Sequence, residues 1–306
     1  MNNIVLLLLC FGLGIALRTS GRLPAGAPAA LNGFVVNISL PALTIVTVQG
    51  LSLQPQIALA ALMPWMLFAI GLAFFWSVGR VLKLSRATTG ALMLTGGLAN
   101  TSCVGLPMIE TWYGREYMGI GIVIDQLGSY LVLSTIGILV AGICRDADGS
   151  AQVDWRAVAR KIAGFAPFVA LLVAFALRPF DLPAGLLAIL RRLADTLVPL
   201  ALVSVGFQLR LSQIRGRIPV LALGLGFKLV LGPALVLLVL VGLLGQTGTV
   251  IRVTVFEAAM GSMIGAAIVA MDHDLDPSLV TLMVGLGIPL SFLTLPGWWW
   301  LLERLA

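Results

Sequence analysis

Long apolar stretches, separated by short polar connections, follow one another along the whole chain. Several have about 20 residues, the length that a helix needs to cross a hydrocarbon core of ~30 Å. They do not alternate between apolar and polar positions, as strands of a membrane β-barrel would, and residues 220–244 are an example. Since backbone groups that face lipid must be satisfied within their own segment, the pattern predicts an all-α membrane protein. The ten expected transmembrane helices lie at residues 3–18, 28–48, 57–79, 87–109, 115–144, 161–179, 186–207, 217–244, 249–271 and 278–302.

The composition agrees with a lipid environment. Hydrophobic residues make up 59% of the chain, charged residues only 10%, and the mean hydropathy is +1.06, whereas a soluble domain carries about 25% charged residues. The net charge of +6 comes from basic residues spread over short connections, which suits lipid headgroups better than nucleic acid. Residues 1–4 lack the positive start of a signal peptide, so we interpret residues 3–17 as a retained first helix. Cys10, Cys103 and Cys144 show neither metal nor disulfide spacing and are expected to be structural thiols.

Three short stretches of the first half recur in the second half at a nearly constant offset of 158 to 160 residues. The matching pairs are residues 16–18 with 176–178, 40–43 with 198–201, and 99–105 with 259–265. The predicted domains are therefore a first repeat at residues 1–144, a polar connection at 145–160 and a second repeat at 161–306. Five helices per repeat is an odd number, so the second repeat enters the membrane from the opposite side. The repeats are then inverted, as in many secondary transporters.

The basic residues of the connections predict the orientation in the membrane. Twelve lie on one side: Arg18, Arg22, Arg80, Lys83, Arg86, Arg145, Arg156, Arg160, Lys161, Arg210, Arg215 and Arg217. The other side has six: Arg115, Arg178, Arg191, Arg192, Arg252 and Arg304. Because basic residues prefer the cytoplasmic side, we expect both termini outside and residues 298–300, a tryptophan triplet, near the outer interface.

The fourth and ninth segments contain glycine and polar residues where a plain spanning helix would be apolar. Residues 95–102 (TGGLANTS) are followed by Pro107, and residues 257–262 (EAAMGS) have the same character. A broken helix frees backbone amides and carbonyls at mid-depth, where half-helix N-termini favour anions and free carbonyls favour cations. Two breaks at matching repeat positions predict a transport site, although glycine and proline also occur in membrane helices for packing alone.

Acidic residues inside the predicted helices are the next signal, because each costs at least ~2.5 kcal/mol at the centre of a membrane helix. Glu257 lies at the ninth-segment break, and Asp125 and Gln126 lie in the fifth segment with Ser129 downstream. Together with Asn100, these side chains are expected to bind Na⁺, with Glu257 as a ligand, or to carry a proton. The alternatives are a surface pair of Glu257 with Arg252 and a shallow position for Asp125.

Other charged residues are given structural interpretations. Asp195 and Lys228 are expected to form an ion pair rather than a transport site. His273, within residues 272–276 (DHDLD), is expected to belong to a solvated helix junction rather than a metal site. No phosphate-binding loop, GxSxG or HExxH motif is present, so neither an enzyme, nor ATP coupling, nor a cofactor is expected.

The run LTGGLANTSCVGLPM at residues 94–108, followed by Tyr113-Gly114, resembles the fourth helix of the auxin efflux carrier family in its bacterial form. The resemblance extends over the whole chain. Its other parts are residues 32–33 and 40–43 in the second helix, 125–128 in the fifth, and 257–260 with 276–277 in the ninth and its exit.

This resemblance implies a ten-helix fold with broken, crossing fourth and ninth helices, related to that of bile acid:sodium symporters. It also implies a scaffold domain of helices 1, 2, 6 and 7 and a core transport domain of helices 3–5 and 8–10. Substrates of the family are carboxylates such as auxin, malate and malonate. Many members have a proline at the ninth-helix break, where this chain has Gly261. The residues implied to line the crossing and bind substrate are Asn100, Thr101 and Ser102 from one side and Met260, Gly261 and Ser262, beside Glu257, from the other.

The function expected from the sequence is alternating-access transport of a small organic anion in the bacterial inner membrane, coupled to Na⁺ or H⁺. The alternatives are a bile acid-type symporter for an amphipathic anion and an uncoupled uniporter or channel. A membrane enzyme or sensor would need clustered catalytic side chains or an attached soluble domain, and the sequence shows neither. The expected partners are the organic anion and the lipid bilayer, with a homodimer as an open possibility.

Overall fold

The computed structural model describes residues 2–48, 55–145, 156, 160, 163–180, 182–208 and 216–305. These residues form helices joined by turns, and no strand occurs among them, so the predicted all-α class is confirmed. Most of the predicted connection at 145–160, with Asp146, Asp148 and Asp154, lies outside the described residues, as do Lys161, Arg210 and Arg215. The α-helices are α1 (Asn2–Thr19), α2 (Ala27–Phe34), α3 (Leu40–Val48), α4 (Gln56–Val81), α5 (Arg86–Gly97), α6 (Leu106–Trp112), α7 (Met118–Val123), α8 (Tyr130–Val132), α9 (Ile138–Cys144), α11 (Ala166–Ala176), α12 (Ala184–Ala194), α13 (Leu197–Gln208), α14 (Ile218–Gly226), α15 (Gly232–Leu237), α16 (Thr249–Ala258), α17 (Ile264–Asp272) and α18 (Pro277–Leu305).

Each predicted apolar segment overlaps with at least one of these helices. Among the described residues, five helical stretches are long and apolar enough to cross a membrane. They are Ala27–Val48, Gln56–Val81, Arg115–Cys144, Ile218–Leu243 and Pro277–Leu305.

Wider π-helical turns interrupt several of the long stretches. They lie at Val35–Ser39, Thr101–Gly105, Ile124–Ser129, Leu133–Gly137, Phe227–Leu231 and Leu238–Leu243. Three of them are followed two residues later by a proline: Pro41 after the first, Pro107 after the second and Pro233 after the fifth. Proline lacks the N–H that would bond the carbonyl four residues earlier, so the helix accommodates it by changing its local hydrogen bonding.

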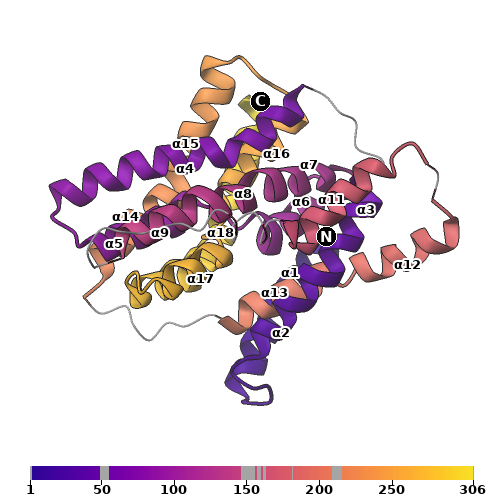
Figure 1. The fold of residues 1–306 in the computed structure, drawn as a ribbon, viewed down its shortest axis with the longest axis horizontal. Coiled ribbons are helices and arrows are strands. Elements are labelled where there is room, and N and C mark those ends of the chain that lie inside the picture. The colour runs from indigo at the N-terminus through magenta and orange to yellow at the C-terminus, as the bar shows by residue number, and fades with distance from the viewer. Residues whose placement is uncertain are drawn as a thin grey trace. The chain divides into compact units, whose positions relative to one another are not determined.

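The chain forms two compact units. The first contains Met1–Gln54, Ser102–Ile122 and Ala159–Leu209. Within it, α1 and α13 lie side by side (Figure 1). A Cβ atom on Gly14 would stand 2.2 Å from the Val203 carbonyl oxygen, and one on Gly206 would stand 2.1 Å from that of Phe11. Glycine is therefore required at both positions for this close helix packing.

The predicted seventh segment is not one continuous helix. α12 ends at Ala194 and α13 begins at Leu197. Pro199, in the first turn of α13, has no N–H to bond the carbonyl of Asp195, which explains the interruption. The Thr196 hydroxyl lies 2.7 Å from that of Ser39 and links this junction to the second predicted segment.

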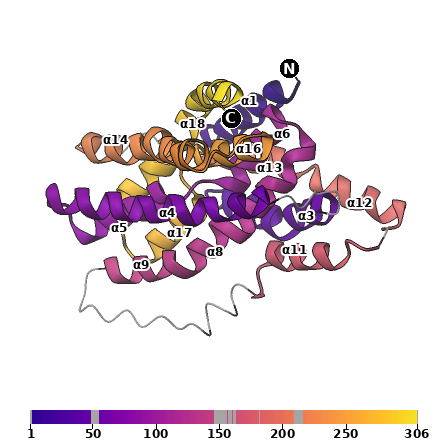
Figure 2. The ribbon, with the colours of Figure 1, turned by 90° about the horizontal axis from the view of Figure 1, so that it is seen from above.

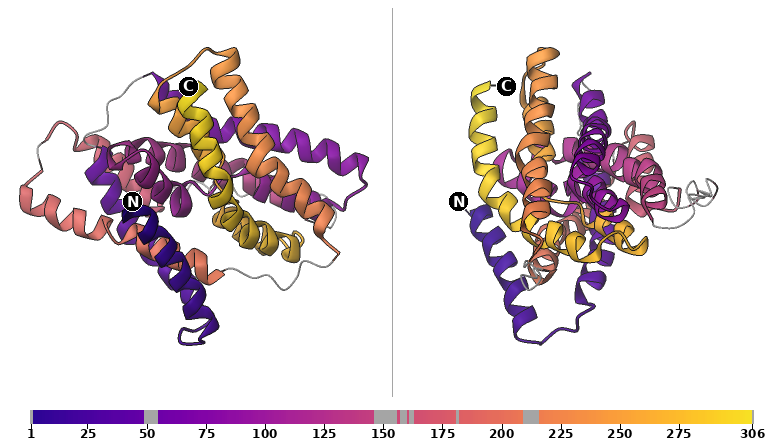
Figure 3. Two further views of the ribbon diagram at one scale, coloured as in Figure 1. Left: turned by 180° about the vertical axis from the view of Figure 1, so that it is seen from behind. Right: turned by 90° about the vertical axis from the view of Figure 1, so that its left-hand side faces the viewer.

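The second unit contains Pro55–Thr101, Val123–Val158 and Arg210–Ala306. Its α5 contacts α4, α9 and α17 (Figures 1 and 2), and α18 runs beside the helical stretch that holds α14 and α15 (Figure 3). The rings of Phe74 and Phe75 on α4 lie with their centroids 4.8 Å from that of Phe227. The Trp298 indole of α18 donates to the Leu229 carbonyl at 2.8 Å. Trp298 therefore contacts a neighbouring helix, while its predicted position at the outer interface stays a prediction.

Candidate functional site

Two helix interruptions meet in the second unit. α5 ends at Gly97 and is followed by Leu98 in an extended conformation, while α16 ends at Ala258 and α17 begins only at Ile264. Ala99 and Ser262 form an isolated antiparallel bridge. The backbone N–H of Asn100 donates to the Gly261 carbonyl at 2.9 Å, and the backbone N–H of Met263 donates to the Leu98 carbonyl at 3.2 Å. The backbone groups freed by each interruption thus bond those of the other, which makes both interruptions tolerable away from water.

Gly261 has a steric reason to be glycine. A Cβ atom there would stand 2.8 Å from the Ile288 Cα and 2.9 Å from the Gly287 carbonyl oxygen, both on α18. The backbone of α18 therefore occupies the space that a side chain, proline included, would need. This explains the departure from the proline that the family resemblance implies at this position.

Glycines of the first interruption have a packing role instead. A Cβ atom on Gly96 would stand 2.5 Å from the Phe75 ring, and one on Gly97 would stand 2.9 Å from the Phe68 ring. These two glycines let α5 approach α4 closely. The glycines at residues 96 and 97 are therefore explained by helix packing, which was the alternative to a transport site for this stretch.

Polar side chains close the first interruption. The Thr101 hydroxyl lies 2.6 Å from the Asp125 Oδ1, to which it donates, and 3.0 Å from the Ser129 Oγ. Asp125 and Ser129 come from the π-helical turn Ile124–Ser129, and both are buried among other residues of the protein. The Trp65 indole donates to the Leu127 carbonyl at 3.1 Å and Gly128 packs against Pro64, which fixes this turn on α4. The structure therefore brings together Thr101, Asp125 and Ser129.

Glu257 lies in the last turn of α16 and is fully buried. Neither of its carboxylate oxygens has a hydrogen-bond partner among the described residues. It interacts electrostatically with Asp125 and with Lys228, although neither lies within hydrogen-bond distance. A buried carboxyl group with no donor is costly unless a proton or a cation accompanies it. The arrangement therefore has the chemistry of a site that takes up a positive charge.

Other predicted residues lie around the same interruption. Asn100, Gln126, Met260 and Ser262 are buried, and the Ser262 hydroxyl has no hydrogen-bond partner among the described residues. Ser102 is half-buried, and it begins the segment Ser102–Ile122 of the first unit.

Two pairings considered from the sequence, the expected pair of Asp195 with Lys228 and the alternative pair of Glu257 with Arg252, are wrong. Asp195 pairs with Arg115 at 2.5 Å, because the helix junction at residues 195–196 places its carboxylate beside that guanidinium. Lys228 instead donates to the carbonyl oxygen of Ala258 at 2.9 Å. Arg252 pairs with Glu303 at 2.9 Å rather than with Glu257. Lys228 is the site residue whose role sequence reasoning missed, and the signal was a lysine inside an apolar segment.

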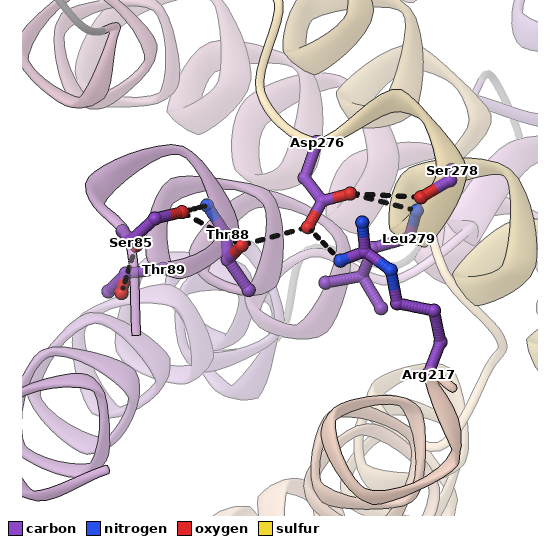
Figure 4. Close-up of polar contacts among 7 residues, drawn as sticks. All are labelled: Ser85, Thr88, Thr89, Arg217, Asp276, Ser278 and Leu279. Atoms are coloured by element: carbon purple, nitrogen blue, oxygen red, sulfur yellow. Dashed lines mark hydrogen bonds and ion pairs between the residues drawn. The ribbon is translucent and has the colours of Figure 1, made fainter. Parts of the chain in front are cut away.

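The ninth segment ends in a different kind of polar cluster (Figure 4). Asp276 accepts hydrogen bonds from Thr88 at 2.8 Å and from Arg217 at 2.6 Å, and its other oxygen accepts from Ser278 and the Leu279 amide. Burial alone would raise the pKa of this carboxyl group, but the hydrogen bonds and the Arg217 charge outweigh it and lower the pKa. Asp276 thereby joins the beginnings of α5, α14 and α18.

The junction around His273 shows no metal site. The imidazole Nδ1 lies 2.8 Å from the Val269 carbonyl oxygen, one turn earlier. Within the described part of the chain, no group of three or more histidine, cysteine or acidic side chains is arranged to hold a metal ion.

Comparison with known proteins identifies the protein family of this chain. The family described as membrane transport protein matches residues 1–299. The chain belongs to this family of membrane transporters. The resemblance to auxin efflux carriers, drawn from residues 94–108 and their companions, is thereby confirmed. The transporter is 28% identical over 295 residues to an uncharacterized transporter of Methanothermobacter thermautotrophicus, with 94% of this chain and 93% of the relative covered. It is 23% identical over 314 aligned positions to an uncharacterized transporter of Methanocaldococcus jannaschii, covering 99% and 98% of the two chains.

Membership of this family, together with the long apolar helices, makes the chain a multi-pass membrane protein. Where the two interruptions meet, polar side chains and irregular backbone are buried within the protein.

Proposed function

We propose that this transporter is a secondary carrier that moves a small organic anion, a carboxylate, by alternating access. The observation that carries the proposal is the antiparallel crossing of two interrupted helices, with buried polar side chains from both. Irregular backbone at membrane depth is tolerated where it lines a site for substrate or ion.

The proposed fold has ten transmembrane helices in two inverted five-helix repeats. Two features support it. The paired residues 99 and 262 lie in the stretches 99–105 and 259–265 that match in the sequence, and their pairing is antiparallel, as an inverted repeat requires. The two compact units also separate helices in a manner similar to the scaffold and core domains of the family resemblance. They differ in the segment Ser102–Ile122, which the resemblance places with the core and which here belongs to the first unit.

The proposed substrate site consists of backbone amides and polar side chains at the crossing. Its residues are Asn100, Thr101, Ser102, Met260, Gly261 and Ser262. The amides at the start of α17, which follows the second interruption, offer an anion the positive end of a helix dipole. The unpartnered Ser262 hydroxyl adds a donor beside them.

The proposed coupling site is centred on Glu257 and Asp125, with Asn100, Gln126 and Ser129 nearby, and its cation is Na⁺ or H⁺. The absence of any donor to Glu257 among the described residues supports it. We place the protein in the bacterial inner membrane with both termini outside, since the excess of basic connections assigns the other side to the cytoplasm.

The test is uptake of radiolabelled malate, malonate and indole-3-acetate into proteoliposomes that contain the purified protein, with an imposed Na⁺ or pH gradient. Saturable uptake and counterflow of one carboxylate would support the carrier. Flux that does not saturate and does not respond to either gradient would indicate a channel. Exclusive uptake of a bulky amphipathic anion, such as a bile acid, would favour the symporter alternative.

A further inference from the structure

Lys228 is a charged residue deep inside the second unit. Its side chain is 0% exposed, and its Nζ donates to the carbonyl oxygen of Ala258 at 2.9 Å. Ala258 is the last residue of α16, immediately before the second interruption. An ionisable residue inside a membrane protein is costly and usually has a function and a definite partner.

The surrounding structure holds Lys228 in this position. It lies in the π-helical turn Phe227–Leu231, and Pro233 cannot supply the N–H that would bond the Leu229 carbonyl. The Trp298 indole bonds that carbonyl instead, at 2.8 Å. The ring of Phe227 stacks on that of Phe74 with centroids 4.8 Å apart. The turn that carries Lys228 is therefore fixed from both sides.

The carbonyl at the end of α16 is the group that a coupling Na⁺ would be expected to use. The C-terminal end of an interrupted helix carries partial negative charge, and free carbonyls there coordinate cations in related architectures. In this protein the Lys228 ammonium already donates a hydrogen bond to the Ala258 carbonyl oxygen and also interacts electrostatically with Glu257. A Na⁺ ligated by both the Glu257 carboxylate and the Ala258 carbonyl would have to displace it. The residues present therefore do not fit the Na⁺ expected beside Glu257.

We propose that the Lys228 ammonium is a tethered cation that stands in place of Na⁺ at the second interruption, so that the protein neither binds Na⁺ there nor depends on it. The statement that transport does not depend on Na⁺ rests on the proposed carrier function. The statement that Lys228 occupies the cation position at the second interruption does not. The cation is then part of the polypeptide. Removal of the Lys228 side chain would leave a position lined by the Ala258 carbonyl and the Glu257 carboxylate.

The test uses Na⁺ alone as the probe, with thermal unfolding of the purified protein in detergent. Melting temperatures are compared in NaCl and in choline chloride at equal ionic strength. The wild type is expected to show no difference. Lys228→Ala exposes the Ala258 carbonyl and Glu257 to solvent cations, and Na⁺ is expected to raise its melting temperature by at least ~2 °C, because a ligand that binds only the folded state stabilises it.

Two variants separate a specific site from a general salt effect. Lys228→Arg keeps the positive charge and is expected to show no response to Na⁺. The double substitution Lys228→Ala with Glu257→Gln removes the carboxylate and is expected to lose the response that Lys228→Ala gained. A Na⁺ response in the wild type, or none in folded Lys228→Ala, would overturn the proposal.

If Lys228→Ala does not fold, binding of ²²Na⁺ to the wild-type protein decides the question. No saturable binding supports the tethered cation, and saturable binding that Glu257→Gln abolishes overturns it. None of these measurements contains an organic anion. Failure of carboxylate uptake would therefore count against the proposed function, and a Na⁺ response in the wild type would count against Lys228 as the cation.

Discussion

The two helix interruptions share a backbone arrangement but differ in their side chains. At the first, Thr101 closes a hydrogen-bonded group with Asp125 and Ser129. At the second, Glu257 and Ser262 are buried without hydrogen-bond partners among the described residues. Buried polar groups are normally satisfied, so an exception of this kind calls for a functional explanation. The first interruption is therefore closed by its own side chains, whereas the second keeps a carboxylate and a hydroxyl group that can interact with a proton or a substrate group.

The difference can be traced to one pair of matching positions. With the offset of 160 residues, Thr101 corresponds to Gly261. The first position carries a hydroxyl group that binds Asp125, while the second has no side chain, because the backbone of α18 lies against it. Two stretches that match in the sequence thus differ in the chemistry of their side chains.

The strongest test of this comparison is Glu257→Gln. The amide has the same shape but carries no negative charge and takes up no proton, so we expect cation-coupled carboxylate uptake into proteoliposomes to fall by about tenfold or more. The melting temperature is expected to change little, because the carboxylate makes no hydrogen bond to a described residue.

Glu303→Gln is the matched control for that experiment. Glu303 pairs with Arg252 and is partly exposed, with 37% of its side chain accessible. We expect its replacement to leave uptake unchanged. Equal uptake by wild type and Glu257→Gln would show that the second interruption is not the coupling site.

Gly261→Ala tests whether the second interruption depends on close approach of α18. The added Cβ would stand 2.8 Å from the Ile288 Cα, and overpacking of a filled interior costs about 1–3 kcal/mol. Thermal unfolding in detergent is the measurement. Gly297→Ala lies on the same helix, where no described atom outside the adjacent backbone comes within 4 Å of the new Cβ, and it is expected to be neutral or slightly stabilising. Equal stability of the two variants would show that α18 can yield at this position.

The sequence predicted the helical class and both interruptions, because apolar length, glycine and polar residues at mid-segment are local signals. It also assigned Asn100 and Glu257 to the same site through the matching of the two interruptions, and Asp125 through its charge inside an apolar segment. What it missed depends on contacts between segments distant in the chain. The partner of Lys228 and the close packing of Gly261 on α18 have no local signature.

The mistaken pair of Asp195 and Lys228 has the same cause. Both residues are charged and lie in apolar segments, and opposite charge alone suggested that they meet. Pro199 interrupts the segment at Asp195, and Arg115 lies within reach of the junction. Opposite charge is a necessary condition for an ion pair, but only the fold determines which opposite charges meet.

Thr101→Val tests the closed character of the first interruption. Valine has nearly the same shape, but it leaves the buried Asp125 without one hydrogen-bond donor, at a cost of about 1–2 kcal/mol. We expect a lower melting temperature together with altered coupling, measured by unfolding in detergent and by uptake at several pH values.

Thr95→Val provides the comparison for Thr101→Val. Thr95 is also buried, but its hydroxyl donates to the Ala91 carbonyl of its own helix, at 2.6 Å, rather than to a carboxylate. We therefore expect a smaller effect on stability and none on coupling. If both variants behave alike, the bond to Asp125 adds nothing beyond the loss of a buried hydroxyl group.

Asp276→Asn lies away from both interruptions and is expected to affect stability alone, by about 1 kcal/mol at neutral pH. Because the folded state lowers the pKa of Asp276, its contribution is complete above the pKa of the unfolded chain. It is lost as the pH falls through the lower pKa of the folded state. The melting temperatures of wild type and variant should therefore differ at pH 7 and converge at strongly acidic pH, while Asp272→Asn, an exposed neighbour, should follow the wild type throughout. Reduced uptake by Asp276→Asn at neutral pH, with unchanged stability, would contradict this expectation. The residues needed for transport would then include those at the beginnings of α5, α14 and α18. The contrast between the two interruptions would no longer account for the function.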